Sequence, residues 1–151
     1  MKFLAYKSTP TNTAAIESYL VDIFNQSQKF NTANNIHGTL FYTGDFFIQA
    51  LEGPTAAIEM LMQNIMDDKR HKKIQILFDT EVKHHSLRDW NMEPLDLTRK
   101  QDFSSKTLMK AIDIVSNTMK LDAEGFVFLL TELLAEPEFQ STLKNWHKKA
   151  R

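Results

Sequence analysis

The sequence predicts an α+β fold, a ferredoxin-like β-α-β-β-α-β sandwich in which one sheet carries two helices on one face. Three observations predict it. Up to residue 97 the hydrophobic spacing alternates between strand-like and helix-like periods in that order. After residue 97 the spacing is helical only. The chain has 151 residues, 42% hydrophobic and 25% charged, which suits one compact core. We therefore expect the sandwich with an additional short strand and C-terminal helices.

The first half of the sandwich follows from alternation and turn residues. Residues 2–8 alternate and precede Pro10, and a later Gly44-Asp45 pair between two aromatic runs favours a hairpin. Apolar residues recur at helical spacing in between, with Ser27 as a polar member of the stripe. The expected elements are a strand at 2–8, a helix from about Thr13 to Lys29, a polar loop at 31–35, a strand at 36–42, a turn at 43–45 and a strand at 46–51.

The rest of the chain is read in the same way. The expected elements are a helix ending near Asp67-Asp68, a strand at 74–82 with Ile74, Ile76, Phe78 and Thr80 on one face, a connection at 83–89, a short strand at Trp90–Met92 closed by Pro94, a helix over 103–119, a helix over 126–134 entered through Asp122 and ended near Pro137, and a basic segment at 143–151 that is either a tail or a frayed helix. Trp90 and Met92, two residues apart, would share a strand face. We expect the helices after residue 97 to pack on the open sheet face or to form a partner surface.

Composition excludes several kinds of chemistry. The absence of cysteine excludes disulfides, Cys-ligated zinc, iron–sulfur clusters and thiol nucleophiles. A net charge of −1 lacks the basic footprint of a nucleic-acid binder. No Gly-rich phosphate loop and no metalloprotease or serine-hydrolase motif is present. The chain start does not resemble a signal peptide, and no apolar run is long enough to span a membrane. We expect a cytoplasmic protein without nucleic-acid or membrane partners.

Tyr6 and Gln49 are the first candidate site residues. They lie mid-strand in two strands that are adjacent in the expected fold, beneath a groove between the two helices. If both face the helices, a phenol and an amide come within hydrogen-bond reach. The alternative is that Gln49 is a satisfied structural amide or lies on the exposed sheet face. A buried amide without partners would cost roughly 1–3 kcal/mol.

The other candidates have structural explanations as well. Asn31, placed in the loop after the first helix, suits a helix C-terminal cap. The run 68–71 suits a solvated charged end of the second helix. The adjacent His84 and His85 point apart, and we expect no metal site. Trp90 and Met92 are more often core residues than cofactor contacts.

Together these residues resemble a known family, the BLUF domain, a blue-light sensor that uses FAD. The resemblance covers roughly residues 2–95, and the Gln-x-Leu-Glu-Gly block is its most specific part. In chain order the matching motifs are Tyr6-Lys7-Ser8, Asn31 followed by Ile36-His37-Gly38, Phe47-Ile48-Gln49-Ala50-Leu51-Glu52-Gly53, Asp68-Lys69-Arg70-His71 and Trp90-Asn91-Met92. Three positions differ from the usual family pattern. His37 replaces Thr, Asn91 replaces Ser, and Asn64 stands where many members have Arg or Lys near the flavin phosphates or ribityl chain.

The resemblance implies a flavin ring between the two helices, above the central strands. It implies that Asn31 bonds the carbonyl edge of the flavin and that Gln49 bridges Tyr6 and the N5/C4-carbonyl edge. Tyr6 would donate an electron and then a proton, and Gln49 would rotate or tautomerise and red-shift the flavin. The implied cofactor-binding residues are Tyr6, Ser8, Asn31, Gln49, Asn64, Asp68, Arg70 and His71, and the implied photoactive residues are Tyr6, Gln49, Trp90 and Met92.

The resemblance also implies a division of labour along the chain. Residues 1–97 would be the photosensor, and residues 98–151 a helical cap that transmits the signal to a partner protein. Trp90 or Met92 would relay the change in Gln49 to these helices. Short members of the family suggest a homo-oligomer that is not an enzyme. Without cysteine, a cysteinyl–flavin adduct is excluded, so the photochemistry would depend on electron transfer and hydrogen bonding.

Two alternatives remain open. One is a BLUF-like module that binds flavin or a partner without photoactivity. The other is a small ferredoxin-like acyl-phosphate hydrolase. The hydrolase needs an arginine in the loop after the first strand, whereas residues 8–12 contain none.

Overall fold

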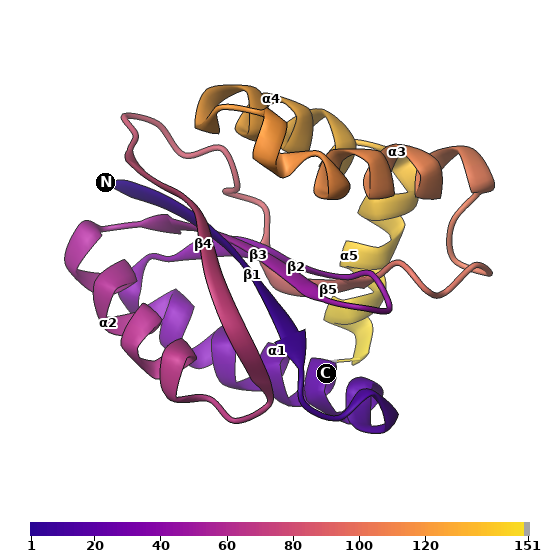
Figure 1. The fold of residues 1–151 in the computed structure, drawn as a ribbon, viewed down its shortest axis with the longest axis horizontal. Helices are drawn as coiled ribbons and strands as arrows, with labels where there is room; N and C mark the ends of the chain where they lie inside the picture. The colour runs from indigo at the N-terminus through magenta and orange to yellow at the C-terminus, as the bar shows by residue number, and fades with distance from the viewer. Residues whose placement is uncertain (150–151) are drawn as a thin grey trace.

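A computed structural model describes residues 1–149, which form one five-stranded sheet between helices (Figure 1). The strand order is β4-β1-β3-β2-β5. All neighbouring strands are antiparallel except β2 and β5, which are parallel. The strands are β1 (Lys2–Pro10), β2 (His37–Tyr42), β3 (Phe47–Gly53), β4 (His71–Glu81) and β5 (Asn91–Asp96). The expected α+β class and the β-α-β-β-α-β order are confirmed.

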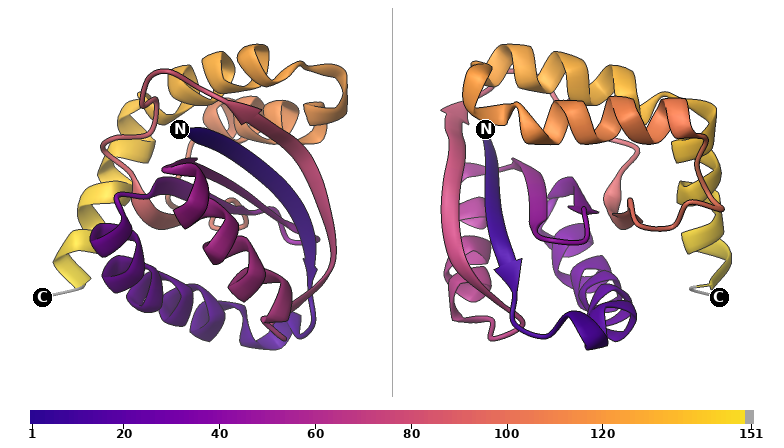
Figure 2. Two further views of the ribbon diagram at one scale, coloured as in Figure 1. Left: turned by 90° about the vertical axis from the view of Figure 1, so that its left-hand side faces the viewer. Right: turned by 45° about the vertical axis from the view of Figure 1, so that its right-hand side comes forward.

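Helices cover both faces of the sheet. Figure 1 shows α1 and α2 on one face and α3 and α4 on the other, while Figure 2 shows α5 running down one side of the sheet. The helices are α1 (Ile16–Asn34), α2 (Thr55–Asp67), α3 (Ser105–Ser116), α4 (Ala123–Leu134) and α5 (Pro137–Lys149), with short 3₁₀ turns at Thr13–Ala15 and Thr118–Lys120. Of the helices after residue 97, α3 and α4 therefore pack on the second sheet face, one of the two placements expected, whereas α5 lies along one side.

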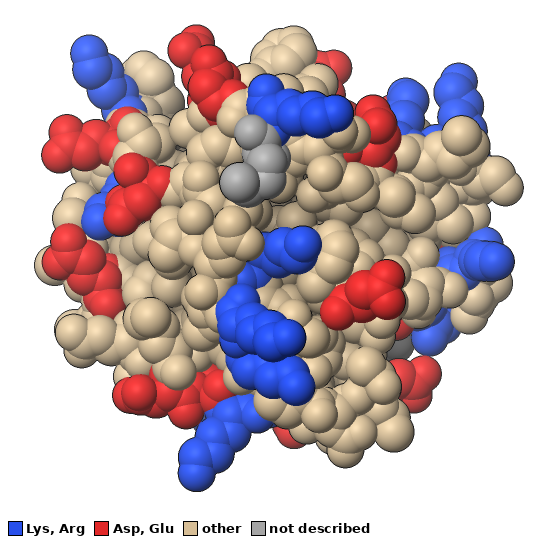
Figure 3. All heavy atoms as spheres, viewed as in Figure 1, with Lys and Arg blue, Asp and Glu red and all other residues tan. Residues whose placement is uncertain are grey.

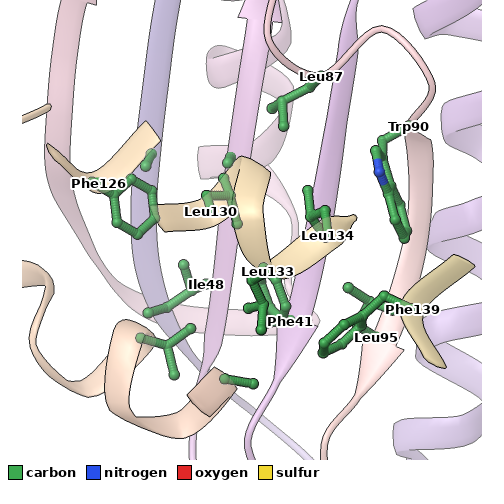
Figure 4. Packing of buried hydrophobic residues seen from close by; sticks show 14 of the residues in the cluster. Phe41, Ile48, Leu87, Trp90, Leu95, Phe126, Leu130, Leu133, Leu134 and Phe139 are labelled. Atoms are coloured by element: carbon green, nitrogen blue, oxygen red, sulfur yellow. The ribbon is translucent and has the colours of Figure 1, made fainter. Parts of the chain in front are cut away.

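The core has two sides because successive strand residues point to opposite faces. On β1, Phe3 and Ala5 point toward α3 and α4, whereas Leu4 and Tyr6 point toward α1 and α2. Figure 4 shows the α3–α4 side, where Phe126, Leu130 and the neighbouring leucines of α4 pack on the sheet. Many of the phenylalanines are buried there. The α3–α4 side is thus closed by apolar packing, and a binding site has to lie on the α1–α2 side.

The first helix is longer than predicted. α1 continues to Asn34, so residues 31–34 are helical and Asn31 lies inside the helix rather than in a loop. The helix ends where Asn35 adopts a left-handed conformation, with φ 56° and ψ 42°, and donates its N–H to the Asn31 carbonyl. Asn is one of the residues that accept this conformation at a helix end. Asn35, and not Asn31, is the capping residue.

β4 differs from prediction because it is bulged. It begins at His71, and its register against β1 shifts between the pairs Ala5–Phe78 and Tyr6–Ile76, which leaves Leu77 as the extra residue. An extra residue reverses the alternation of a strand. Phe78 therefore packs on the α3–α4 side, whereas Ile74 packs on the α1–α2 side. The four residues predicted to share a face do not do so.

The C-terminal segment, predicted as a basic tail or a frayed helix, belongs to a regular helix. α5 begins at Pro137, which suits the first turn of a helix because proline lacks an N–H there. The expected tail at 143–151 is thus helical to residue 149, and residues 150–151 lie outside the described residues. Among residues 1–149 no helix is long and apolar enough to cross a membrane. Acidic and basic side chains are interspersed on the face in Figure 3, apart from a short basic run near β4.

Candidate functional site

A cavity of about 220 Å³ lies between α1 and α2, above β1 and β3. That volume exceeds the ~10–15 Å³ needed for one water molecule many times over. Its lining combines apolar side chains with a set of amides and charged groups. The lining residues are Tyr6, Ile23, Gln26, Ser27, Phe30, Asn31, Leu40, Phe47, Gln49, Leu61, Asn64, Ile65, Asp68, Arg70 and His71.

Tyr6 and Gln49 form the floor of this cavity. They are directly paired across β1 and β3, and the Tyr6 hydroxyl donates a hydrogen bond to Gln49 Oε1. Gln49 Nε2 in turn donates to Met92 Sδ, 2.8 Å away, so the amide is held at both ends. Tyr6 and Met92 are buried, and Gln49 is only 5% exposed. The structure thus brings together the phenol and amide that the strand positions predicted.

Burial sets the protonation of Tyr6. It raises the pKa of the phenol far above its ordinary value, and the nearby Asp68 carboxylate raises it further. Arg70 opposes these two effects to a smaller extent. Tyr6 is therefore a neutral phenol, which keeps its proton and donates a hydrogen bond to Gln49.

His71 supports Tyr6 from the side. Its ring lies edge-on to the Tyr6 ring at 5.9 Å between centroids. His71 Nε2 lies 2.7 Å from the Ile65 carbonyl, which can only accept, so Nε2 carries a proton. Nδ1 lies 2.7 Å from the Ser8 hydroxyl, and in a neutral imidazole it accepts from that hydroxyl. Ser8 thus fixes His71 and does not line the cavity itself.

Asn31 presents an unsatisfied amide to the cavity. The residue is 1% exposed, and neither its Oδ1 nor its Nδ2 has a hydrogen-bond partner among residues 1–149. Buried polar atoms are rarely left in this state. An aromatic ring edge that offers both an acceptor and a donor would satisfy both amide atoms at once. Asn31 therefore fits a planar heterocyclic ligand such as a flavin.

A charged group closes the end of the cavity near the α2 C-terminus. Arg70 forms a two-pronged ion pair with Asp68 and also donates to Gln26 on α1, at 3.0 Å. Burial of the Asp68 carboxyl tends to raise its pKa, but the bonds and charge of Arg70 outweigh this and lower the pKa. The segment 68–71 is a structured part of the site rather than a solvated charge run. Asn64 lies exposed at the cavity rim.

Trp90 and Met92 lie on opposite faces, contrary to the prediction. Met92 belongs to the α1–α2 side and contacts Gln49, whereas Trp90 packs among residues of the α3–α4 side (Figure 4). The reason is the backbone: Met92 has φ 70°, and the register of β5 against β2 shifts beside it. Gly38 permits the close approach, since a Cβ there would lie 2.7 Å from the Met92 methyl group.

Several cavity residues were missed by sequence reasoning. Gln26, Ser27 and Phe30 line the cavity from α1, beside Asn31. The sequence carried one signal for them. Ser27 is polar within an apolar helical stripe, and Asn31 follows it one turn later once the helix is extended. The helix end, predicted too early, concealed that relation.

Comparison with known protein families identifies the chain. Residues 1–93 match the model of the BLUF family, described as sensors of blue light using FAD. The chain belongs to the BLUF family. A BLUF domain is a photosensory module. In this BLUF domain the cavity above Tyr6 and Gln49 fits a flavin, because the unsatisfied amide of Asn31 lines it.

Relatives agree with this assignment. The chain is 32% identical over 90 residues to the photoactivated adenylate cyclase subunit alpha of Euglena gracilis, covering 60% of this chain and 8% of the cyclase. The BLUF domain thus corresponds to a small part of that much longer relative. The solved structure of BlsA in its photo-activated state is 28% identical, with a TM-score of 0.71, and the match covers 90% of this chain and 96% of BlsA.

Two further structures place the BLUF domain in different molecules. A bacterial light-regulated adenylyl cyclase is 26% identical with a TM-score of 0.67, covering 80% of this chain and 34% of the cyclase. Klebsiella pneumoniae BlrP1, solved with FMN and cyclic diGMP, is 25% identical with a TM-score of 0.58, covering 74% of this chain and 29% of BlrP1. In both relatives the matched region is about a third of a longer chain.

Proposed function

We propose that this BLUF domain binds FAD in the cavity between α1 and α2 and uses the Tyr6–Gln49–Met92 hydrogen-bond chain as its light switch. The observation that carries the proposal is that chain, which lies buried on the cavity floor. A flavin, when bound, supplies blue-light absorption and an excited state that accepts an electron and a proton. Asn31 would hold its carbonyl edge, and Asn64, Asp68 and Arg70 would lie toward its ribityl and phosphate end.

Tyr6 is the donor in this proposal. Its phenol is protonated and hydrogen-bonded, so an electron and then a proton can leave it in sequence. Asp68 and Arg70 place opposite charges near the phenol. Ser8 and His71 hold the phenol in position. The electron would leave Tyr6 for a bound flavin and the proton would leave through Gln49; both would return to Tyr6, so no net chemistry would occur and the protein would act as a sensor rather than an enzyme.

Gln49 is the switching element. Its carbonyl end faces Tyr6 and its NH₂ end faces Met92. Rotation of the amide exchanges these ends, and tautomerisation turns the oxygen into a donor. Either change breaks the present pattern and gives two discrete arrangements whose populations light can shift. A new hydrogen bond from Gln49 would then account for a red-shifted flavin spectrum.

Met92 is the relay in this proposal, because it contacts Gln49 and belongs to β5, whereas Trp90 lies on the other sheet face. Residues 1–97 would be the sensor, and residues 98–151 would carry the signal to a partner protein through the C-terminal helices. A homo-oligomeric state and a cytoplasmic location remain predictions from the sequence.

The test is spectroscopic. Purified protein should be yellow, mass analysis of the released cofactor should give FAD rather than FMN, and blue light should red-shift the flavin band reversibly. Tyr6→Phe and Gln49→Glu should abolish that shift while the protein still binds flavin. Tyr42→Phe is the matched control, since this buried tyrosine donates to the Gly44 carbonyl away from Gln49 and should leave the shift intact. A colourless protein that takes up no flavin would contradict the proposal, and a yellow protein without a shift would indicate a flavin-binding module without photoactivity.

A further inference from the structure

Met92 is held in an unusual backbone conformation. Its φ of 70° lies in the left-handed region, which residues with a side chain seldom occupy because it is strained. The conformation matters because it turns the Met92 side chain toward Gln49, while Trp90 remains on the opposite face. Something in the surrounding structure must therefore stabilise it.

The Glu93 carboxylate is placed to do so. Its Oε2 accepts a hydrogen bond from the Asn91 N–H at 2.5 Å, so the side chain of one neighbour of Met92 bonds the backbone of the other. The Asn91 carbonyl accepts from Gln28 Nε2 of α1, also at 2.5 Å. The backbone before Met92 is thus fixed by two side chains. Glu93 itself is fully buried.

The second oxygen of Glu93 faces α5. Glu93 Oε1 lies 3.0 Å from Nε2 of His147, whose side chain is about half exposed; this is an ion-pair distance, and the oxygen forms no hydrogen bond among the described residues. One residue earlier on α5, the Trp146 indole donates to the Pro94 carbonyl at 2.8 Å. Residues 93 and 94 are therefore both tied to one turn of α5. Burial raises the pKa of the Glu93 carboxyl above its ordinary value, because this effect outweighs the Asn91 N–H and His147, which lower it.

We propose that Glu93 is a positioning residue that holds Met92 against Gln49 and, through His147, couples that arrangement to the docking of α5. The inference rests on the proposed light switch for its biological meaning. Because coupling between two sites is reciprocal, a change at Gln49 that displaces Met92 loosens α5, and loss of the His147 contact loosens Met92. Glu93 is fully buried, so loss of its contact with His147 leaves a buried acidic group with fewer partners, which is unfavourable.

The first test uses flavin-free protein and amide hydrogen exchange. In His147→Ala, opening should increase by about fivefold or more, the lower end of typical coupling, at the Asn91 amide as well as along α5. His147→Gln, which keeps a polar N–H group at this position, should restore most of the protection. Glu136→Gln is the matched control. It removes the ion pair near the start of α5 in which Glu136 Oε1 lies 2.9 Å from Lys110 Nζ. Hydrogen exchange at the Asn91 amide should remain unchanged.

The second test uses flavin-loaded protein. Light should increase exchange along α5 in the wild type, and His147→Ala should show that exposure already in the dark, with an altered dark-recovery rate of the flavin spectrum. Unchanged exchange at Asn91 in His147→Ala would overturn the coupling. If the wild type shows no red shift, the light switch fails, while the flavin-free test still decides the role of Glu93.

Discussion

Replacing Asn31 by leucine is expected to stabilise the flavin-free protein and to weaken its affinity for flavin. The side chain is 1% exposed, and both polar atoms of its amide are without partners among the described residues. A buried polar group left in this state costs about 1–3 kcal/mol, and an apolar side chain of similar size removes that cost. The free energy of unfolding of the flavin-free variant should therefore rise by about 1–3 kcal/mol, measured by urea denaturation.

The same change removes two hydrogen bonds from the bound state. At about 0.5–1.5 kcal/mol each, their loss corresponds to an increase of roughly 5–150-fold in the flavin Kd. Quenching of flavin fluorescence during titration measures this Kd directly. The opposite signs of the two effects distinguish a ligand-binding residue from an ordinary structural amide.

Asn34→Leu is the matched control on the same helix. Asn34 lies three residues further along α1, and its Nδ2 already donates to the Phe30 carbonyl at 2.8 Å. Its replacement should not stabilise the flavin-free protein and should leave the flavin Kd unchanged. If Asn31→Leu lowered the stability of the flavin-free protein and left the Kd as it was, Asn31 would be a satisfied structural residue, and the assignment of the cavity to flavin would lose its main support.

Three other changes test the site. Gly38→Ala should destabilise the fold by about 1–3 kcal/mol in urea denaturation and alter the lit–dark difference spectrum, because the added Cβ would clash with the Ala50 backbone carbonyl and would lie 2.7 Å from the Met92 methyl group; unchanged stability and spectrum would contradict the close approach. Arg70→Gln should destabilise the protein at neutral pH but progressively less as the pH falls through 3.8, the ordinary Asp pKa, and below it. The folded-state pKa of Asp68 is lowered, so the stability it contributes is present above the unfolded-state pKa and is lost on acidification; a pH-independent difference in urea midpoints would refute this. Since burial raises the pKa of Tyr6, the amplitude of the light-induced shift should remain constant up to about pH 10, where an ordinary phenol ionises; a titration of that amplitude with a midpoint below pH 10 would disagree.

The sequence by itself determined the sheet-and-helix plan and the floor of the site. Alternation in β1 and β3 placed Tyr6 and Gln49 in adjacent strands, because strand periodicity and the order of elements fix which residues can pair. The motif resemblance determined which of the polar residues to examine. Both inferences depend on local spacing, which a sequence displays directly.

Only the tertiary structure decided the details that depend on irregular backbone. The end of α1 at Asn34 placed Asn31 in the cavity wall, and the left-handed Met92 separated it from Trp90. The bulge at Leu77 likewise divided β4 between the two faces. The connection between Glu93 and α5 joins residues more than fifty positions apart. Such features arise where packing overrides local preference, since one shifted residue reverses every side chain that follows it.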